Sequence, residues 1–191
     1  MRKLGFTLIE LLITLTILAI LLGIAGPWFN DLKQQQESTA AINQLVGSIQ
    51  ITRNAAISMH ATVTLCPRSA GNRYICGKRN QWQAGALAFL DENSNGRVDG
   101  DETIIQRFPP LIKGSITYWR SFRNRSFLQI NSRGITNWQN GNLLYCPPGD
   151  DPKFARQIII SVTGRVRFAR DNDHDGIVED ARGKPVSCPG R

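Results

Sequence analysis

An almost unbroken apolar run opens the chain, from Phe6 to Ala25. These roughly 20 residues make a helix of about 30 Å at about 1.5 Å per residue, which is the thickness of the hydrocarbon core of a bilayer. Arg2 and Lys3 precede the run, so we expect the N-terminus to stay in the cytoplasm and the rest of the chain to be exported. The pattern predicts one retained membrane-spanning helix over residues 6–26.

A helical period continues after the apolar run. Gly26 and Pro27 should weaken or kink the helix, because proline removes one backbone donor and crowds the preceding turn. Gln, Glu, Lys and Ala then dominate to about residue 59. The apolar positions among them fall on roughly one face: Ile42, Leu45, Val46, Ile49 and Ala56. This stripe predicts an amphipathic continuation over residues 27–60 that packs on a sheet.

From residue 61 onward, short β-rich runs are separated by Gly, Asn and Pro clusters, which favours an antiparallel sheet. The expected strands cover residues 61–66, 85–90, 102–108, 115–119, 126–130, 142–146 and 156–168. We therefore expect an α+β fold, in which a long N-terminal helix packs on an antiparallel β-sheet head that comprises residues 61–191.

One carboxylate, Glu10, interrupts the apolar run. A carboxylate at the centre of a membrane helix costs about 2.5–3.5 kcal/mol, so Glu10 is a candidate functional residue. If the chain is cut after Gly5, a new α-amine appears on Phe6. Side-by-side helices can then pair the amine of one chain with the Glu10 carboxylate of its neighbour. The alternative is that Glu10, near the end of the span, reaches the membrane interface.

The segment KLGFTLIELLITLTILAIL, residues 3–21, resembles the class III signal of type IV prepilins and type II secretion pseudopilins. The short basic leader, Gly5, Phe6 and Glu10 carry this resemblance. It implies a leader peptide over residues 1–5, which a prepilin peptidase in the inner membrane removes after Gly5 before it N-methylates Phe6. It also implies the type IV pilin fold and a role for Glu10 in docking subunits into a filament.

The formal net charge of +8 suits an acidic partner such as nucleic acid, although excess Lys and Arg also serve solubility. Two acidic loops, residues 91–102 and 171–182, hold most of the 15 carboxylates, and no acidic residue occurs between Thr103 and Gly149. The remainder is therefore more basic than the total suggests.

The segment YWRSFRNRSF mixes arginines with aromatic residues. We expect Tyr118, Trp119 and Phe122 to face the core and the arginines to be solvated. The alternative is a surface that follows a phosphate backbone and stacks on bases.

The first acidic loop, DENSNGRVDGDE, fits the EF-hand pattern. Its matching positions are Asp91, Asn93, Asn95, Gly96, Asp99 and Glu102. Its flanks look like strands, so the turn chemistry of a hairpin tip explains the same residues, and we expect no cofactor. Calcium at residues 91–102 is the alternative. The loop at 171–182 repeats Asp171, Asp173, Asp175 and Gly176 but has Arg182 where the last Glu belongs, so it is a weaker calcium candidate.

Four cysteines lie in the exported part, where disulfides form and persist, and four allow three pairings. Cys66 and Cys76 bracket a short loop, so we expect them to pair and Cys146 to pair with Cys188. A zinc site is the alternative, but the sequence has no CxxC spacing, and its two histidines, His60 and His174, are the only ones that could complete a ligand set.

An alternating run near the C-terminus brings two arginines together. In a single strand of period two over residues 156–168, one side is apolar and the other carries Ser161, Thr163, Arg165 and Arg167. Gly164 should clear a gap where a phosphate backbone could approach both guanidinium groups, with Arg170 and Lys184 downstream. The alternative is an edge strand protected by positive charge.

TGRVR, residues 163–167, resembles the G-R-x-R motif of FimT-like minor pilins, which bind DNA during uptake in natural transformation. The N-terminal signal, the long helix, the strand-rich head and the C-terminal cysteine make nearly the whole chain similar to the GspH/FimT group. The resemblance implies a minor pilin that binds DNA non-specifically and assembles with other pilin subunits. The alternative is a GspH-like minor pseudopilin of a type II secretion system, or an initiator of pilus assembly, with protein contacts only.

The sequence offers no combination of nucleophile, base and orienting group, and no phosphate-cradling glycine loop. We therefore expect neither enzymatic activity nor a small-molecule substrate. The expected location is the bacterial inner membrane, with a single-pass anchor and a periplasmic head that becomes extracellular when the subunit enters a pilus.

Overall fold

The computed structural model describes residues 7–69, 71 and 75–189. The chain divides into two compact units, Met1–Gln36 and Glu37–Arg191, and we describe each by itself. One helix, α1 (Leu8–Ser58), runs through both. Gly26 and Pro27 lie within it, since one lost backbone hydrogen bond is a small part of the ladder of a 51-residue helix.

In the first unit, the apolar side chains of α1 are open to solvent. From Leu8 to Leu22 the large ones are 51% to 78% exposed. The predicted span over residues 6–26 includes Phe6, which lies outside the described residues. Within the described part of the chain, no helix is long and apolar enough to cross a membrane.

The first sheet of the second unit, called the globular unit below, has the strand order β3-β2-β1-β5. Its strands are β1 (Val63–Pro67), β2 (Ala86–Leu90), β3 (Ile104–Phe108) and β5 (Leu128–Ile130). All neighbours are antiparallel. The register places Val63 opposite both Leu90 and Ile130.

The second sheet has the strand order β4-β6-β7-β8 and is also antiparallel. Its strands are β4 (Ile116–Ser121), β6 (Gly141–Cys146), β7 (Arg156–Ile160) and β8 (Val166–Phe168). Three short 3₁₀ helices lie in the connections: η1 (Trp82–Ala84), η2 (Phe122–Asn124) and η3 (Pro152–Phe154). The predicted helix on an antiparallel β-sheet head is confirmed, and the described strands form two sheets.

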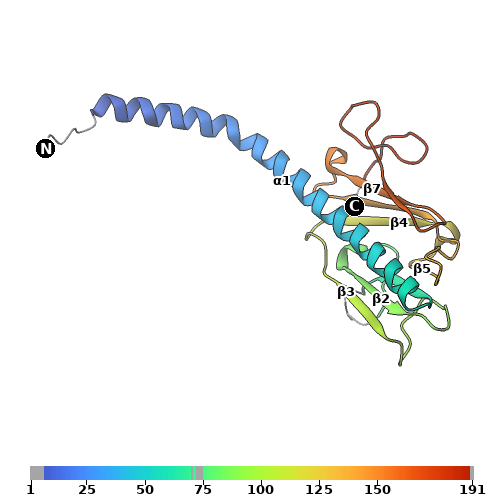
Figure 1. The fold of residues 1–191 in the computed structure, drawn as a ribbon. Helices are drawn as coiled ribbons and strands as arrows, with labels where there is room; N and C mark the ends of the chain where they lie inside the picture. The colour runs from blue at the N-terminus through green and yellow to red at the C-terminus, as the bar shows by residue number, and fades with distance from the viewer. Residues whose placement is uncertain (1–6, 70, 72–74, 190–191) are drawn as a thin grey trace. The chain divides into compact units, whose positions relative to one another are not determined.

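Residues 37–58 of α1 lie across both sheets (Figure 1). The predicted stripe is buried, because Ile42, Leu45, Ile49 and Ala56 are all at most 3% exposed. The same core contains Leu65 of the first sheet and Ile158 of the second. Between the sheets, the Trp82 and Trp119 rings lie 5.9 Å apart and are tilted by 58°.

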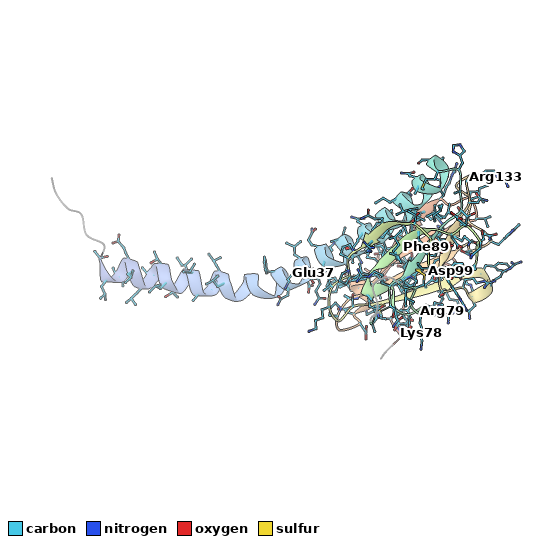
Figure 2. The ribbon with its side chains drawn as sticks, turned by 90° about the horizontal axis from the view of Figure 1, so that it is seen from below. Glu37, Lys78, Arg79, Phe89, Asp99 and Arg133 are labelled. Atoms are coloured by element: carbon cyan, nitrogen blue, oxygen red, sulfur yellow. A yellow bond between two sulfur atoms is a disulfide. The ribbon has the colours of Figure 1, made fainter. Side chains whose placement is uncertain are left out.

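Most charged side chains lie on the surface of the globular unit, and Asp91 and Glu179 are buried. Phe89 is fully buried within the globular unit, whereas Lys78, Arg79 and Arg133 are exposed and point outward (Figure 2).

Two disulfides tie loops to the sheets. Cys66 of β1 pairs with Cys76, and Cys146 of β6 pairs with Cys188, so both predicted bridges are present. The second bridge holds the C-terminal tail against the second sheet, where Val186 packs with Leu144 and Ala155. His60 and His174 are exposed loop residues.

Removing the Cys146–Cys188 bridge should destabilise the globular unit more than removing the Cys66–Cys76 bridge. Sequence separations of 42 and 10 predict losses of about 4 and about 3 kcal/mol, because the longer loop restricts the unfolded chain more. Guanidinium denaturation of the two double Cys→Ser variants measures the difference. The pairs are matched, since Cys66 and Cys146 are both fully buried. Equal or reversed losses would contradict the prediction.

Candidate functional site

Glu10 forms a capping box at the start of α1. Its Oε2 accepts hydrogen bonds from the backbone N–H and the hydroxyl of Thr7, both at 2.9 Å, and its own N–H donates to Thr7 Oγ1 at 3.4 Å. This reciprocal pair satisfies donors that every helix N-terminus leaves unpaired. Glu10 therefore has a local partner within the single chain. Gly5 and Phe6, the predicted cleavage and methylation residues, lie outside the described residues.

The two predicted DNA-binding arginines lie on a hairpin, so the prediction of one continuous strand over residues 156–168 is wrong. The chain turns between β7 and β8, with the Gly164 N–H donating to Ser161 O and the Ser161 N–H donating to Arg165 O, both at 3.0 Å. Gly164 has φ = +74°, the left-handed conformation expected for a glycine that closes a three-residue hairpin loop. We call residues 161–167 the arginine turn.

Gly164 opens no gap for a ligand, contrary to the sequence interpretation. It is buried, and a Cβ on it would lie 2.3 Å from Gly134 O and 3.2 Å from Arg53 Nε. Arg53 Nε of α1 donates to Gly134 O at 3.0 Å, and Thr136 N–H donates to Val162 O at 2.9 Å. The glycine therefore lets the arginine turn dock on a neighbouring turn and on the helix.

Arg165 and Arg167 themselves are exposed. Between them, Val166 pairs with Ile160 and packs against the core, whereas Arg167 pairs with Ile159 on the opposite face of the sheet. The alternation predicted for the arginines therefore holds across β8, and both guanidinium groups are available to an anion in solution.

Arg170 and Lys184 lie beside carboxylates rather than in an open basic patch. Arg167 and Arg170 line a pocket together with Glu179 and Asp180. The backbone N–H groups of Arg182 and Lys184 donate to Asp180 Oδ1 at 2.7 and 3.1 Å. The hydrogen bonds from Lys184 and Arg182 hold the pKa of Asp180 below its usual range, so this carboxylate stays charged near the two predicted cations.

The acidic loop 91–102 is a hairpin tip between β2 and β3, as the turn interpretation expects. Asp91 is fully buried, and its Oδ2 accepts from Thr64 Oγ1 at 2.5 Å, Gln129 Nε2 at 2.8 Å and Gly96 N–H at 3.0 Å. Asp91 therefore joins the loop to β1 and β5.

Two other acidic side chains of this loop, Asp99 and Glu102, also have partners within it. Amide hydrogen bonds from Asn93 and Asn95 lower the pKa of Asp99, whereas burial raises the pKa of Glu102. Glu102 Oε2 accepts from the Asp99 N–H at 3.0 Å. These carboxylates thus have loop partners of their own.

Carboxylates converge instead in the second acidic loop. Within the described residues, oxygens of Asp171, Asp173 and Glu179 lie within 4.8 Å of one another, close enough to hold a metal ion. Glu179 reaches this position because its oxygens accept from the Asn172 N–H and amide at 2.7 to 3.0 Å. The EF-hand pattern places its last ligand at position 182, where Arg182 stands. The sequence prediction for this loop did not include Glu179.

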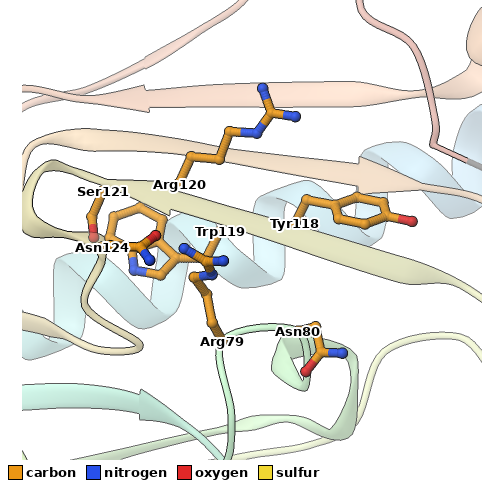
Figure 3. Close-up of a pocket in the computed structure, with 7 residues that line it drawn as sticks. All are labelled: Arg79, Asn80, Tyr118, Trp119, Arg120, Ser121 and Asn124. Atoms are coloured by element: carbon orange, nitrogen blue, oxygen red, sulfur yellow. The ribbon is translucent and has the colours of Figure 1, made fainter.

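The arginine and aromatic segment at 118–127 divides between core and surface. Trp119 is 2% exposed, whereas Phe122 is 56% exposed, so the prediction that Phe122 faces the core is wrong. Alternation along β4 places Trp119 inward and leaves Arg120 outward. Arg120 extends from β4 over the neighbouring strand, while Arg79 lies on the other side of β4 (Figure 3).

The strand register aligns Arg120 with the arginine turn, which the sequence analysis missed. Arg120 pairs with Asn142, Asn142 with Ile159, and Ile159 with Arg167. Directly paired residues point to the same face, so these four form one row across the outer face of the second sheet. We call it the outer row. The row depends on the register of three strand pairs, β4 with β6, β6 with β7 and β7 with β8.

The long N-terminal helix and the antiparallel sheets on which it packs are those of a type IV pilin-like fold. The family described as Type II transport protein GspH matches residues 41–164, and the prokaryotic N-terminal methylation motif matches residues 1–26. The chain belongs to the GspH family. It is thus a minor pilin or pseudopilin of a type IV pilus or a type II secretion system. The motif implies processing by a prepilin peptidase, inner-membrane anchoring and assembly with other pilin subunits.

Solved structures share this fold. The type IV minor pilin FimU of Pseudomonas aeruginosa (strain PAO1), in two crystal forms, is 14% identical, with TM-scores of 0.55 and 0.57 over 79% and 83% of this chain and 99% of each FimU chain. The minor pseudopilin EpsH from the type 2 secretion system of Vibrio cholerae is 11% identical over 69% of this chain and 95% of its own, with a TM-score of 0.48. No curated protein matches the chain.

Asp91→Ala should destabilise the globular unit by about 3 kcal/mol or more, because it removes the carboxylate that accepts from buried donors of Thr64, Gln129 and Gly96. Denaturant titration measures the loss. Asp101→Ala is the matched control, since Asp101 is exposed on the same loop and its loss should change stability by under about 0.5 kcal/mol. Equal effects of the two substitutions would show that Asp91 does not organise the loop.

Proposed function

We propose that this protein is a non-enzymatic minor pilin of a type IV pilus that binds DNA without sequence specificity during uptake in natural transformation. Arg165 and Arg167 contact phosphates, and Arg170 and Lys184 add positive charge nearby. Gly164 shapes the turn that presents the arginines. Retraction of the fibre then draws the bound DNA inward. The single observation that carries the proposal is the exposure of both arginines on a turn anchored to the rest of the globular unit.

Phosphate contact is the chemistry that this turn supports. A guanidinium group binds a phosphate through paired N–H donors, and each phosphate that is neutralised releases counterions. Contacts to phosphates position the protein on the DNA but do not recognise the base sequence. The formal net charge of +8 adds long-range attraction for a polyanion.

We infer the assembly step from Glu10. Cleavage after Gly5 frees the α-amine of Phe6, and a Glu10 carboxylate on a neighbouring helix then pairs with it. The capping box shows that Thr7 satisfies Glu10 in a single chain, so assembly exchanges a local hydrogen bond for an intermolecular ion pair. In the membrane the chain is single-pass, with its N-terminus cytoplasmic and the β-rich head periplasmic, and it becomes extracellular in the pilus.

A second candidate function is that of a minor pseudopilin of a type II secretion system, or an initiator of pilus assembly, with protein contacts only. The carboxylates beside Arg170 and Lys184 favour it, because they offset part of the positive charge that DNA would meet. The two candidates differ in whether the arginine turn binds DNA.

Replacing both arginines, Arg165→Ala with Arg167→Ala, should weaken binding of duplex DNA by at least about tenfold at low salt. The slope of log K against log salt should fall in magnitude by about 2, because each lost phosphate contact removes about 0.9. The measurement is fluorescence anisotropy of the processed full chain in non-ionic detergent at several salt concentrations.

The matched control for this experiment is Arg97→Ala with Lys113→Ala, which removes the same charge from exposed positions away from the arginine turn. It should retain most of the affinity. Negligible DNA binding by the unsubstituted chain, or equal losses in both double variants, would favour protein contacts as the sole function.

Glu10→Gln should abolish incorporation into fibres while leaving α1 intact. Glutamine keeps the capping hydrogen bonds but carries no charge for the neighbouring amine. Thr7→Ala is the complementary control, because it weakens the cap by about 1 kcal/mol and keeps the charge. Immunoblotting of sheared fibres measures incorporation, and mass spectrometry checks for a methylated N-terminal Phe6. Normal incorporation of Glu10→Gln, or recovery of the intact leader, would contradict the proposed assembly step.

A further inference from the structure

Three aromatic side chains are exposed in the described part of the globular unit, and all three adjoin the second sheet. Phe122 directly follows β4, Trp138 shortly precedes β6, and Phe168 ends β8; they are 56%, 60% and 49% exposed. The described strands of the first sheet carry no exposed aromatic ring, although the segment of Trp138 also adjoins β5, where the Asn137 N–H donates to Gln129 O at 3.0 Å. The Arg123 guanidinium already lies over the Phe122 ring, with Cζ 6.0 Å from the ring centroid. The ring surface that remains exposed on these residues is available to stack on another planar group.

Backbone hydrogen bonds connect the segments that carry two of these rings to the arginine turn. The Phe122 N–H donates to Asn140 O at 2.9 Å, and Thr136 N–H donates to Val162 O at 2.9 Å. Trp138 stands midway between Thr136 and Asn140. The segment 136–140 therefore runs from the arginine turn to Phe122, and Trp138 lies along it.

The backbone around these rings is held in an uncommon conformation. Trp138 has φ = +55°, and Arg123 and Asn124, which follow Phe122, have φ = +62° and +54°. Non-glycine residues adopt this region at a cost, and such positions cluster at functional sites. Of the seven such non-glycine positions among the described residues, three are Trp138 itself and the two residues that follow Phe122.

The charges near Phe122 and Trp138 suit a polyanion. Arg120 lies in the outer row with Arg167, three strand spacings away, or about 14 Å at about 4.8 Å per strand. The row itself carries no carboxylate. Arg123 and Arg125 differ, because they line a pocket with Ser94 and Asn95 of the acidic 91–102 loop. Phe168 differs because it pairs with Ile158 and so lies on the other face of β8 from the outer row. It lines a pocket with Arg167, Glu179 and Asp180.

We propose that the outer row and the rings of Phe122 and Trp138 form a binding surface for single-stranded nucleic acid. Arg120, Arg165 and Arg167 contact the phosphates, while the two rings stack on unpaired bases. A duplex keeps its bases stacked within the helix, so it reaches the arginines and leaves the rings unused. The inference rests on the proposed DNA-binding function and adds to it the strand state that the surface prefers.

The test compares a fluorescein-labelled oligo-dT with a labelled duplex of equal length, on the processed full chain in non-ionic detergent. Phe122→Ala with Trp138→Ala should weaken oligo-dT binding by about 10-fold to 100-fold, since stacking contributes about 1–3 kcal/mol per base. Duplex binding should change by less than about twofold. The conservative pair Phe122→Tyr with Trp138→Phe should restore most of the affinity for oligo-dT.

Two matched controls sharpen the comparison. Phe168→Ala removes an exposed ring that faces carboxylates and should leave oligo-dT binding unchanged. Arg120→Ala should weaken the binding of both oligo-dT and duplex and should lower the magnitude of the slope of log K against log salt by about 1. Arg97→Ala should change neither quantity. Oligo-dT should also quench the fluorescence of Trp138, and Trp138→Phe should lose that quenching.

The outcomes separate this inference from the function on which it rests. Equal binding of oligo-dT by the aromatic double variant and the unsubstituted chain overturns the inference alone, provided that Arg165→Ala with Arg167→Ala still loses duplex binding. Binding of neither nucleic acid by the unsubstituted chain overturns both. Loss of fibre incorporation with unchanged oligo-dT binding assigns the rings to a subunit contact and overturns the inference.

Discussion

The buried face of α1 is the constraint on which the globular unit depends. The described strands form two sheets with no shared ladder, and the inner faces of both sheets pack on Ile42, Leu45 and Ile49. Each of these side chains is at most 3% exposed, and its burial contributes about 1.5–3 kcal/mol. A shift of this face would move both sheets at once. The same helix holds the arginine turn through Arg53 and Gly134, so the packing of α1 also sets where the arginines lie.

That anchoring changes the physical meaning of the glycine in TGRVR. A side chain at Gly164 would collide with the backbone of Gly134, and a carbonyl oxygen cannot move aside as the end of a flexible side chain can. The glycine is required by a turn that docks on another turn, and not by a phosphate that approaches the backbone. Arg165 and Arg167 are consequently presented by a rigid hairpin whose loop is tied to a helix and to Thr136. Preorganisation of this kind reduces the entropy lost when a ligand binds.

The sequence was sufficient for the elements but not for their pairing. The apolar stripe of α1 and the apolar runs of β1, β2 and β6 are visible in the local sequence, and the structure has these elements. The three strands are buried along most of their length and do not alternate between buried and exposed positions. The hairpin was missed because Ile160 pairs with Val166 and Ile158 with Phe168, so inward positions are even-numbered on both arms. One strand and this hairpin produce the same alternation. Arg120 was missed because its partner row depends on the register of distant strands, which no local period encodes.

The acidic loops limit where a polyanion can approach this surface. Ser94 and Asn95 of the first acidic loop line a pocket with Arg123 and Arg125. Glu179 and Asp180 of the second acidic loop line a pocket with Arg170. At physiological ionic strength the Debye length is about 8 Å, and repulsion from each loop therefore acts mainly on phosphates close to it. The outer row runs from Arg120 to Arg167, and its Arg167 end lines the same pocket as Glu179 and Asp180. Under the proposed function, the unequal distribution of charge directs the phosphate backbone along that row, which a uniformly basic surface of the same net charge would not do.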